Sequence, residues 1–244
     1  MTSDASAAVV RVAGVIRNYQ GLRPLRLMSL SIAQGERVAL TGLDAAAAEV
    51  LVNLITGAAL PDQGEVSVFG RSTACIASGD EWLASLERYG IVSPRAVLLE
   101  SASIEQNLAM PFTLEIDPVP PAIAARVEAL AIECGIGEET GGVADMLRAP
   151  AGGVTPEVRA RLHFARAVAL EPALLVLEHP TAGLAGDRAR QAFAADVARV
   201  LDGRGLTALV ITEDEPFALR AAHRTLRLQP ATGELKPIKR GWFR

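Results

Sequence analysis

Hydrophobic and polar residues along this chain follow two patterns that predict strands of two kinds. Some short segments alternate between apolar and polar positions, which predicts strands with one face buried and one face in solvent. Others are apolar at every position, which predicts strands of a sheet covered on both faces. The first set consists of 65–69, which alternates, and of 9–17 and 26–32, which also have the character of short strands; the continuous apolar segments are 38–41, 173–177 and 206–212. The first set predicts an antiparallel patch near the start of the chain, and the second predicts a central sheet.

Between these strands, apolar residues return every three or four positions, which predicts helices that face a core. The first such helix carries Val50, Leu51, Leu54 and Ile55 on one side. The stretch 94–170 is rich in helical pattern and is broken by several prolines. The alternation of strands and helices predicts an α/β fold with a mostly parallel sheet and helices on both sides.

Composition and charge narrow the class of protein. The chain has 244 residues, half of them hydrophobic, which is ordinary for a globular α/β protein. Its net charge of −4 does not indicate a nucleic-acid-binding surface. Cys75 and Cys134 are far apart in the sequence and indicate neither a disulfide framework nor a metal site. We expect Cys134 to be a small core residue. The first residues do not resemble a signal peptide, and no apolar run is long enough to span a bilayer.

The loop after the strand 38–41 has the layout of a phosphate-binding loop without its chemistry. The working pattern is G-x-x-x-x-G-K-S/T, in which loop amides and the Lys hold phosphates and the hydroxyl holds Mg²⁺. Counting from Gly42, the second Gly falls on Ala47, the Lys on Ala48 and the Ser/Thr on Glu49. Asp44 followed by four alanines instead favours a capped helix that begins within a residue or two of Asp44.

The order of these segments and their amino-acid sequences resemble those of the nucleotide-binding subunit of an ABC transporter along almost the whole chain. The matching segments are Gly35-Glu36, 60–70, 164–172 and the segment 174–184, which resembles the family's Walker B strand. The resemblance implies one ABC-cassette-like domain over 1–244. It would have an α/β core like that of P-loop NTPases, an N-terminal antiparallel β subdomain and an inserted helical subdomain at about 94–170.

Carried over residue by residue, the resemblance identifies the positions of a nucleotide site. Tyr19 matches the residue that would stack on adenine, Gly42 the first loop glycine, Ala48 the Lys, Glu49 the metal-binding hydroxyl and Glu178 the Walker B aspartate. Most of these residues cannot supply the family's contacts. We therefore predict a degenerate nucleotide site with no assigned metal ligands and no catalytic residue.

Other functional positions of the family are also replaced. Pro94 stands at the loop glutamine, His179 at the general base, Ala185 at the dimer-contacting aspartate and Glu213 at the switch histidine. The signature sequence aligns with Val154-Thr-Pro-Glu-Val158, where Thr155 with Pro156 predicts a helix N-cap and first turn in place of a phosphate grip. Hydrolysis by the usual route is not expected, because cation and metal clamps supply most of the stabilisation in phosphoryl transfer.

Three functions follow from the resemblance. The first is a non-hydrolysing subunit or pseudoenzyme that acts through partners, namely a membrane permease and a second, competent cassette. The alternatives are an ATP-binding subunit that still binds ATP with Mg²⁺ weakly, and a free cytosolic scaffold or regulator. We expect a cytoplasmic protein that reaches the inner face of the membrane through its partner. The segment 98–113 falls where such cassettes receive a permease helix, although core packing explains its apolar residues equally well. The basic and aromatic tail 236–244 predicts either a surface contact or a solvated end.

Overall fold

The central layer of the molecule is a six-stranded, mostly parallel sheet. The computed structural model describes residues 8–137 and 142–238. In spatial order the strands are β10 (Glu234–Pro237), β9 (Arg224–Gln229), β3 (Arg37–Thr41), β8 (Ala208–Ile211), β7 (Leu174–Glu178) and β6 (Tyr89–Val92). Neighbours from β9 to β6 pair in parallel, and β10 pairs antiparallel with β9. The three continuous apolar segments lie side by side in this sheet, which confirms the predicted core.

A second, four-stranded sheet forms the antiparallel patch that the alternating segments predict. Its spatial order is β2 (Leu25–Ala33), β1 (Ala8–Arg17), β4 (Gln63–Val68) and β5 (Arg71–Ser72). All its pairings are antiparallel. The sequence pattern did not reveal β9 and β10, because Arg224, Arg227 and Lys236 interrupt their apolar residues.

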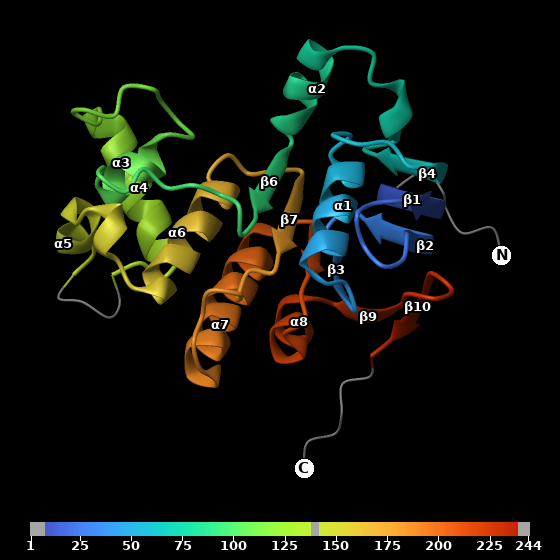
Figure 1. The fold of residues 1–244 in the computed structure, drawn as a ribbon. Coiled ribbons are helices and arrows are strands. Elements are labelled where there is room, and N and C mark those ends of the chain that lie inside the picture. Colours follow the sequence, from blue (N-terminus) through green and yellow to red (C-terminus); the bar gives the residue numbers. More distant parts are fainter. Residues whose placement is uncertain (1–7, 138–141, 239–244) are drawn as a thin grey trace.

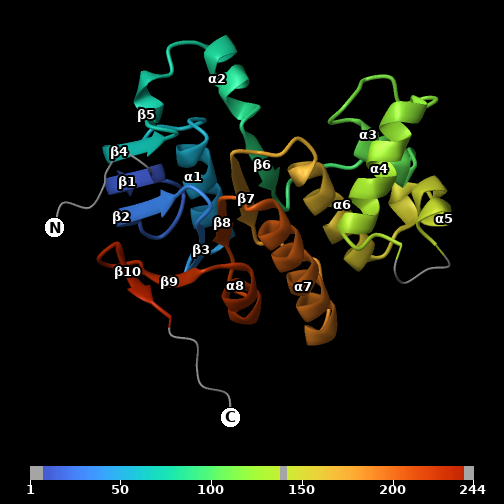
Figure 2. The same ribbon diagram turned by 180° about the vertical axis from the view of Figure 1, so that it is seen from behind.

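The helices cover both faces of the central sheet and extend it at one end. They are α1 (Ala45–Ile55), α2 (Gly79–Leu86), α3 (Ile104–Ala109), α4 (Pro121–Glu133), α5 (Val143–Arg148), α6 (Pro156–Val168), α7 (Asp187–Arg204) and α8 (Glu215–Ala221), with 3-10 turns at 73–75 and 151–153. Figures 1 and 2 show α3, α4 and α5 gathered at one end, opposite the four-stranded sheet. We call α3, α4, α5 and α6 the helical arm. These four helices lie between β6 and β7 in the chain.

Successive residues of the central strands point into two different cores. Val38 and Leu40 of β3 belong to a core shared with α1 and the four-stranded sheet. Ala39, between them, belongs to the core shared with α6, α7, α8 and the arm. This division follows from the two-residue period of a strand. It explains why these strands are apolar at every position.

Two predictions about local structure have different outcomes. Cys134 is fully buried, as predicted, and burial raises the pKa of its thiol to about 12. At α2, the Ser78 hydroxyl accepts from the amide of Glu81, but the Glu81 carboxylate accepts from the amide of Ala77. The reciprocal capping box that the spacing of Ser78 and Glu81 in the sequence predicts is therefore only half formed. The assignment of one domain over 1–244, with an arm bounded at 94–170, stays a prediction, and the tail beyond Ile238 lies outside the described residues.

Candidate functional site

The candidate site lies at the carboxyl edge of the parallel sheet. Because β3, β8, β7 and β6 are parallel neighbours, the residues that follow them meet at one edge. These residues are Gly42 after β3, Glu213 after β8, His179 after β7 and Arg95 after β6. The fold therefore brings together segments that are far apart in the sequence.

The loop at Gly42 is closed by the chain's own carboxylates. The Gly42 amide donates to Glu213 Oε1 at 2.9 Å. Helix α1 begins at Ala45, and the Asp44 carboxylate accepts from the amide of Ala47 at 2.8 Å. The next amide, that of Ala48, already donates to the Asp44 carbonyl oxygen at 2.8 Å. The predicted N-cap is thus confirmed, and the amides of Gly42, Ala47 and Ala48 all have acceptors within the chain.

Ala47 and Ala48 face the protein interior. Ala48 is 0% exposed and Ala47 is 8% exposed, and both belong to the core beneath α1. Glu49, by contrast, is half-exposed. A lysine at position 48 would therefore start from a packed site with no open space for its side chain.

Tyr19 lies close enough to Asp44 of this loop to feel its charge. Its ring is partly buried against the core around α1. The ring also lies against the backbone of Gly21, where an added Cβ would be 2.5 Å from Tyr19 Cε2. Burial, together with the nearby Asp44 charge, raises the pKa of the Tyr19 hydroxyl. The ring thus packs on its own segment, beside a negative charge.

The two acidic residues at the metal-binding positions share one arginine. Glu178, at the end of β7, is 1% exposed, and its two oxygens accept from Arg95 Nη1 at 2.8 Å and Nη2 at 2.7 Å. Glu49 Oε2 lies 3.4 Å from Arg95 Nη1. A single guanidinium therefore connects both carboxylates.

His179 has a constrained backbone but no catalytic partner among the described residues. Its φ is +42°, in the left-handed region, and its amide donates to the Ile211 carbonyl oxygen at 2.7 Å. Its Nε2 is buried and has no hydrogen-bond partner in the described structure. It lines a cavity of about 460 Å³ together with Pro94, His163 and Glu178. Because Glu178 is already paired, this arrangement supplies no base with an orienting acid.

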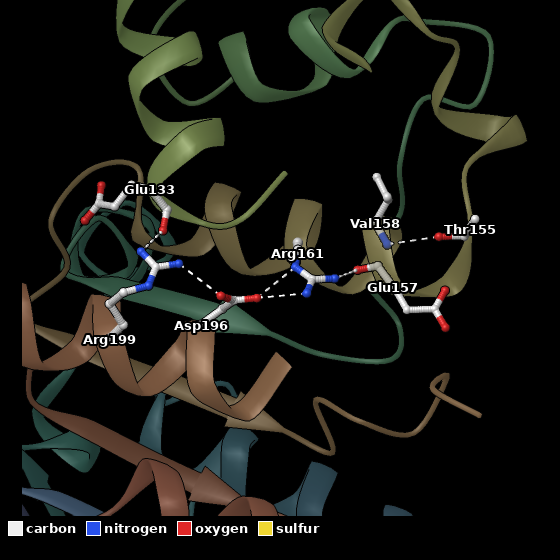
Figure 3. A network of polar contacts seen from close by, with 7 residues as sticks. All are labelled: Glu133, Thr155, Glu157, Val158, Arg161, Asp196 and Arg199. Atoms are coloured by element: carbon white, nitrogen blue, oxygen red, sulfur yellow. Dashed lines mark hydrogen bonds and ion pairs between the residues drawn. The ribbon is translucent and has the colours of Figure 1, made fainter. Parts of the chain in front are cut away.

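The helix at the signature position is capped and then anchored to the core. The Thr155 hydroxyl accepts from the amide of Val158 at 3.4 Å, which confirms the predicted N-cap. One turn further, Arg161 Nε donates to Asp196 Oδ2 of α7 at 2.9 Å, and Arg199 Nη2 donates to Asp196 Oδ1 at 3.0 Å. Figure 3 shows Asp196 between these two guanidiniums. Arg161 and Asp196 are both buried, so this network fixes α6 on α7.

The segment 98–113 divides between core and surface. Leu98, Ile104 and Leu108 are buried in the arm, which favours the core-packing interpretation for them. The residues on either side of the segment are exposed instead: Val97 is 75% exposed and Leu114 is 96% exposed. A hollow of about 280 Å³ lies nearby, lined among others by residues 86, 96, 111 and 170. Apolar surface thus remains next to the segment.

Sequence reasoning missed Arg95 and Asp196. Arg95 follows Pro94, which had been matched only for the absence of a glutamine. The available signal was charge: acidic residues at both position 49 and position 178 require a cation nearby if either is buried. No comparable signal identified Asp196, because its helix shows polar residues on several faces.

Comparisons with known proteins agree with this architecture. A family model described as "ABC transporter" matches residues 25–182. The methionine import ATP-binding protein MetN of Mesorhizobium japonicum is 29% identical over 214 residues, which cover 86% of this chain and 55% of MetN. The macrolide export ATP-binding/permease protein MacB 1/2 of Paracoccus denitrificans is 26% identical over 230 residues, covering 93% of this chain and 33% of MacB. The chain thus spans about half the length of MetN, or less in the case of MacB.

Solved structures show the same fold. The dimeric ATP-binding cassette MJ0796 bound to ADP and Pi superposes with a TM-score of 0.74 at 21% identity, covering 96% of this chain and all of that one. The cbiO1 protein of Clostridium perfringens, part of the ABC transporter complex cbiONQ, gives 0.72 at 20% identity, covering 96% of this chain and 88% of cbiO1. The fold is an ABC cassette.

The chain belongs to the ABC transporter family, as its sequence motifs predicted. In the described parts of the chain, no helix has both the length and the apolar character needed to cross a membrane. The same parts contain no cluster of three or more His, Cys, Asp or Glu side chains that could hold a metal ion.

The family implies ATP with Mg²⁺, and the residues present do not fit that ligand. The Lys position is a buried alanine, and the Gly42 amide already donates to a carboxylate. The two acidic positions that could hold a metal are bonded to Arg95. Neither a phosphate nor a metal finds free groups at these points.

Proposed function

We propose that this chain is a non-hydrolysing ABC-type cassette, a pseudoenzyme that acts through protein partners. The observation that carries the proposal is the closed loop, in which Glu213 and Asp44 accept from the amides of Gly42 and Ala47. A phosphate bound in this loop would compete with these carboxylates for backbone donors, and both carboxylates would repel it. The chain has the fold of an ABC cassette, but the groups at the positions of the nucleotide site are bonded to one another.

The partners that we propose are those of the family: a membrane permease and a second cassette that retains the catalytic residues. The exposed side chains of Val97 and Leu114, which flank the segment 98–113, and the hollow lined in part by Pro111 and Leu170 support a protein contact at the arm. A chain that performs this role is cytoplasmic and peripheral to the membrane. The genes for a permease and a second cassette are then expected beside the gene for this chain, whereas a free scaffold would have neither.

The alternative is a subunit that still binds ATP weakly. It would have to use Tyr19, the remaining loop amides and Glu178. The packing of Tyr19 on Gly21 and the pairing of Glu178 with Arg95 both oppose this function. The described residues offer no compensating cation at position 48.

Calorimetric titration of the purified chain with Mg-ATP, and separately with ATP alone, tests the proposal. We expect no binding heat in either titration. The Glu213→Ala variant is a useful second sample, because it frees one amide and removes one negative charge while Asp44 still caps α1. We expect it to behave like the parent chain. Saturable binding by the parent chain would overturn the proposal and favour the weak ATP-binding subunit.

A further inference from the structure

Arg95 occupies the position of a cation between two carboxylates. It contacts Glu178 with two hydrogen bonds of 2.8 and 2.7 Å and approaches Glu49 at 3.4 Å. The exposures of the three side chains differ, at 1% for Glu178, 45% for Arg95 and 46% for Glu49. The cation thus reaches from the surface to a fully buried anion.

The buried carboxylate explains why a cation must be there. An ionised carboxylate without a partner is strongly destabilised when it is removed from water. A guanidinium satisfies both of its oxygens in the two-pronged geometry that lysine cannot provide. Hard divalent cations are the other common partner of paired carboxylates. Glu178 therefore requires either a metal or a side chain such as Arg95, and the half-exposed Glu49 adds a second negative charge beside it.

We propose that Arg95 is a built-in replacement for a divalent cation at this site, and that it keeps metal ions out by occupying both carboxylates. The proposal rests on the proposed function, since a chain that does not use Mg-ATP has no need of a free metal site. It goes further by naming the residue responsible and by predicting a latent divalent-cation site beneath it. Loss of the Arg95 side chain should open that site.

The same residue also fixes the segment that leads into the arm. Arg95 joins this segment to Glu178 at the end of β7. Two residues after Arg95, the Val97 carbonyl oxygen accepts a hydrogen bond from Arg166 Nη1 of α6 at 2.8 Å. A covalently attached cation cannot dissociate, whereas a metal ion can. Arg95 and Arg166 therefore hold this segment in place without any ligand.

The test compares four chains by thermal unfolding with and without Mn²⁺. They are the parent chain, Arg95→Met, Arg95→Met with Glu178→Gln, and the control Arg159→Met. Arg159 is a matched control because its ion pair with Glu100, at 3.7 Å, involves side chains that are 36% and 70% exposed. Mn²⁺ is chosen because its binding can also be measured directly by electron paramagnetic resonance.

We expect Arg95→Met to lower Tm by about 10 °C, because breaking a buried ion pair leaves an unpaired charge. Millimolar Mn²⁺ should recover most of this loss and give a saturable resonance signal. Adding Glu178→Gln should restore Tm without metal and abolish the Mn²⁺ effect. The parent chain and Arg159→Met should show no Mn²⁺ dependence.

The proposal would be overturned by an Arg95→Met chain with an unchanged Tm, or by one that is destabilised but binds no Mn²⁺. If Arg95→Met does not fold alone, it should be refolded with and without Mn²⁺; folding only with Mn²⁺ supports the proposal, and failure in both contradicts it. Mn²⁺ binding by the parent chain would also contradict it. Failure of the proposed function is a separate result, because it appears as Mg-ATP binding by the parent chain in calorimetry.

Discussion

Restoring the two most conspicuous missing groups of the phosphate-binding loop should not restore nucleotide binding. The variant combines Ala48→Lys with Glu49→Ser, which returns a cation for phosphates and a hydroxyl for a metal. Position 48 is the obstacle, because Ala48 is 0% exposed and packs in the core beneath α1. The amides of Gly42 and Ala47 also keep their internal acceptors.

The expected cost can be set against the gain that binding would bring. Inserting the extra methylenes costs about 1–3 kcal/mol, and desolvating the ammonium adds several more, for a total on the order of 5 kcal/mol. At about 2–4 °C per kcal/mol for a chain of this size, Tm should fall by about 10–20 °C. Loss of the half-exposed Glu49 contributes about 1 kcal/mol or less.

Differential scanning fluorimetry with and without Mg-ATP measures both effects. A ligand at a hundred times its dissociation constant would add about 2.7 kcal/mol, which would raise Tm by about 5–10 °C. We expect no such rise. The matched control is Ala46→Lys on the exposed side of the same helix turn, where a cation near the helix start costs only about 0.3–1 kcal/mol. A double variant that melts no lower than the control, or that gains several degrees with Mg-ATP, would refute the reasoning and show an open nucleotide site.

Three further predictions use other parts of the structure. The purified chain should show no Mg²⁺-dependent ATP hydrolysis in a phosphate-release assay, and His179→Ala should leave that background unchanged; turnover that this change abolished would refute the prediction. Asp196→Asn should lower the free energy of unfolding in urea by about 3–5 kcal/mol because it breaks a buried pair. The control Asp145→Asn in α5, whose ion pair with Arg148 joins side chains that are 82% and 76% exposed, should cost less than about 1 kcal/mol; equal costs would contradict the role of burial. Hydrogen bonding to Arg204 lowers the pKa of Glu133 below its usual 4.5. This carboxylate therefore stabilises the fold above pH 4.5, and its contribution is lost as the pH falls through the lower pKa that it has in the folded chain. Glu133→Gln should make the dependence of Tm on pH flatter in that range.

The parts of the site that sequence reasoning predicted correctly are local. The cap at Asp44 bonds to an amide three residues away, and the cap at Thr155 does the same. Such bonds depend on residue type and spacing within one turn, so the sequence contains all the information that they need. The strands at 38–41, 173–177 and 206–212 were predictable for a related reason, since a strand buried on both faces must be apolar throughout.

The parts that could not be predicted join distant segments. Arg95 and Glu178 are 83 positions apart, and Gly42 and Glu213 are 171 apart. Position matching identified Glu178 and Glu213 as replacements of functional residues, but it could not show what their side chains contact. Arg95 does not correspond to any residue of the family's sequence motifs. Only the three-dimensional arrangement shows that it pairs with Glu178.

These contacts would also oppose the recovery of ATP binding by single substitutions. Residues that merely lost their ligand would leave buried polar groups without partners, which is costly. At this site Glu178 has Arg95, and the Gly42 amide has Glu213. A change that restores one ligand-binding group would therefore break an internal bond before it could create a useful contact. We therefore expect recovery of ATP binding to need several simultaneous substitutions, and each intermediate should be less stable than the chain as it is.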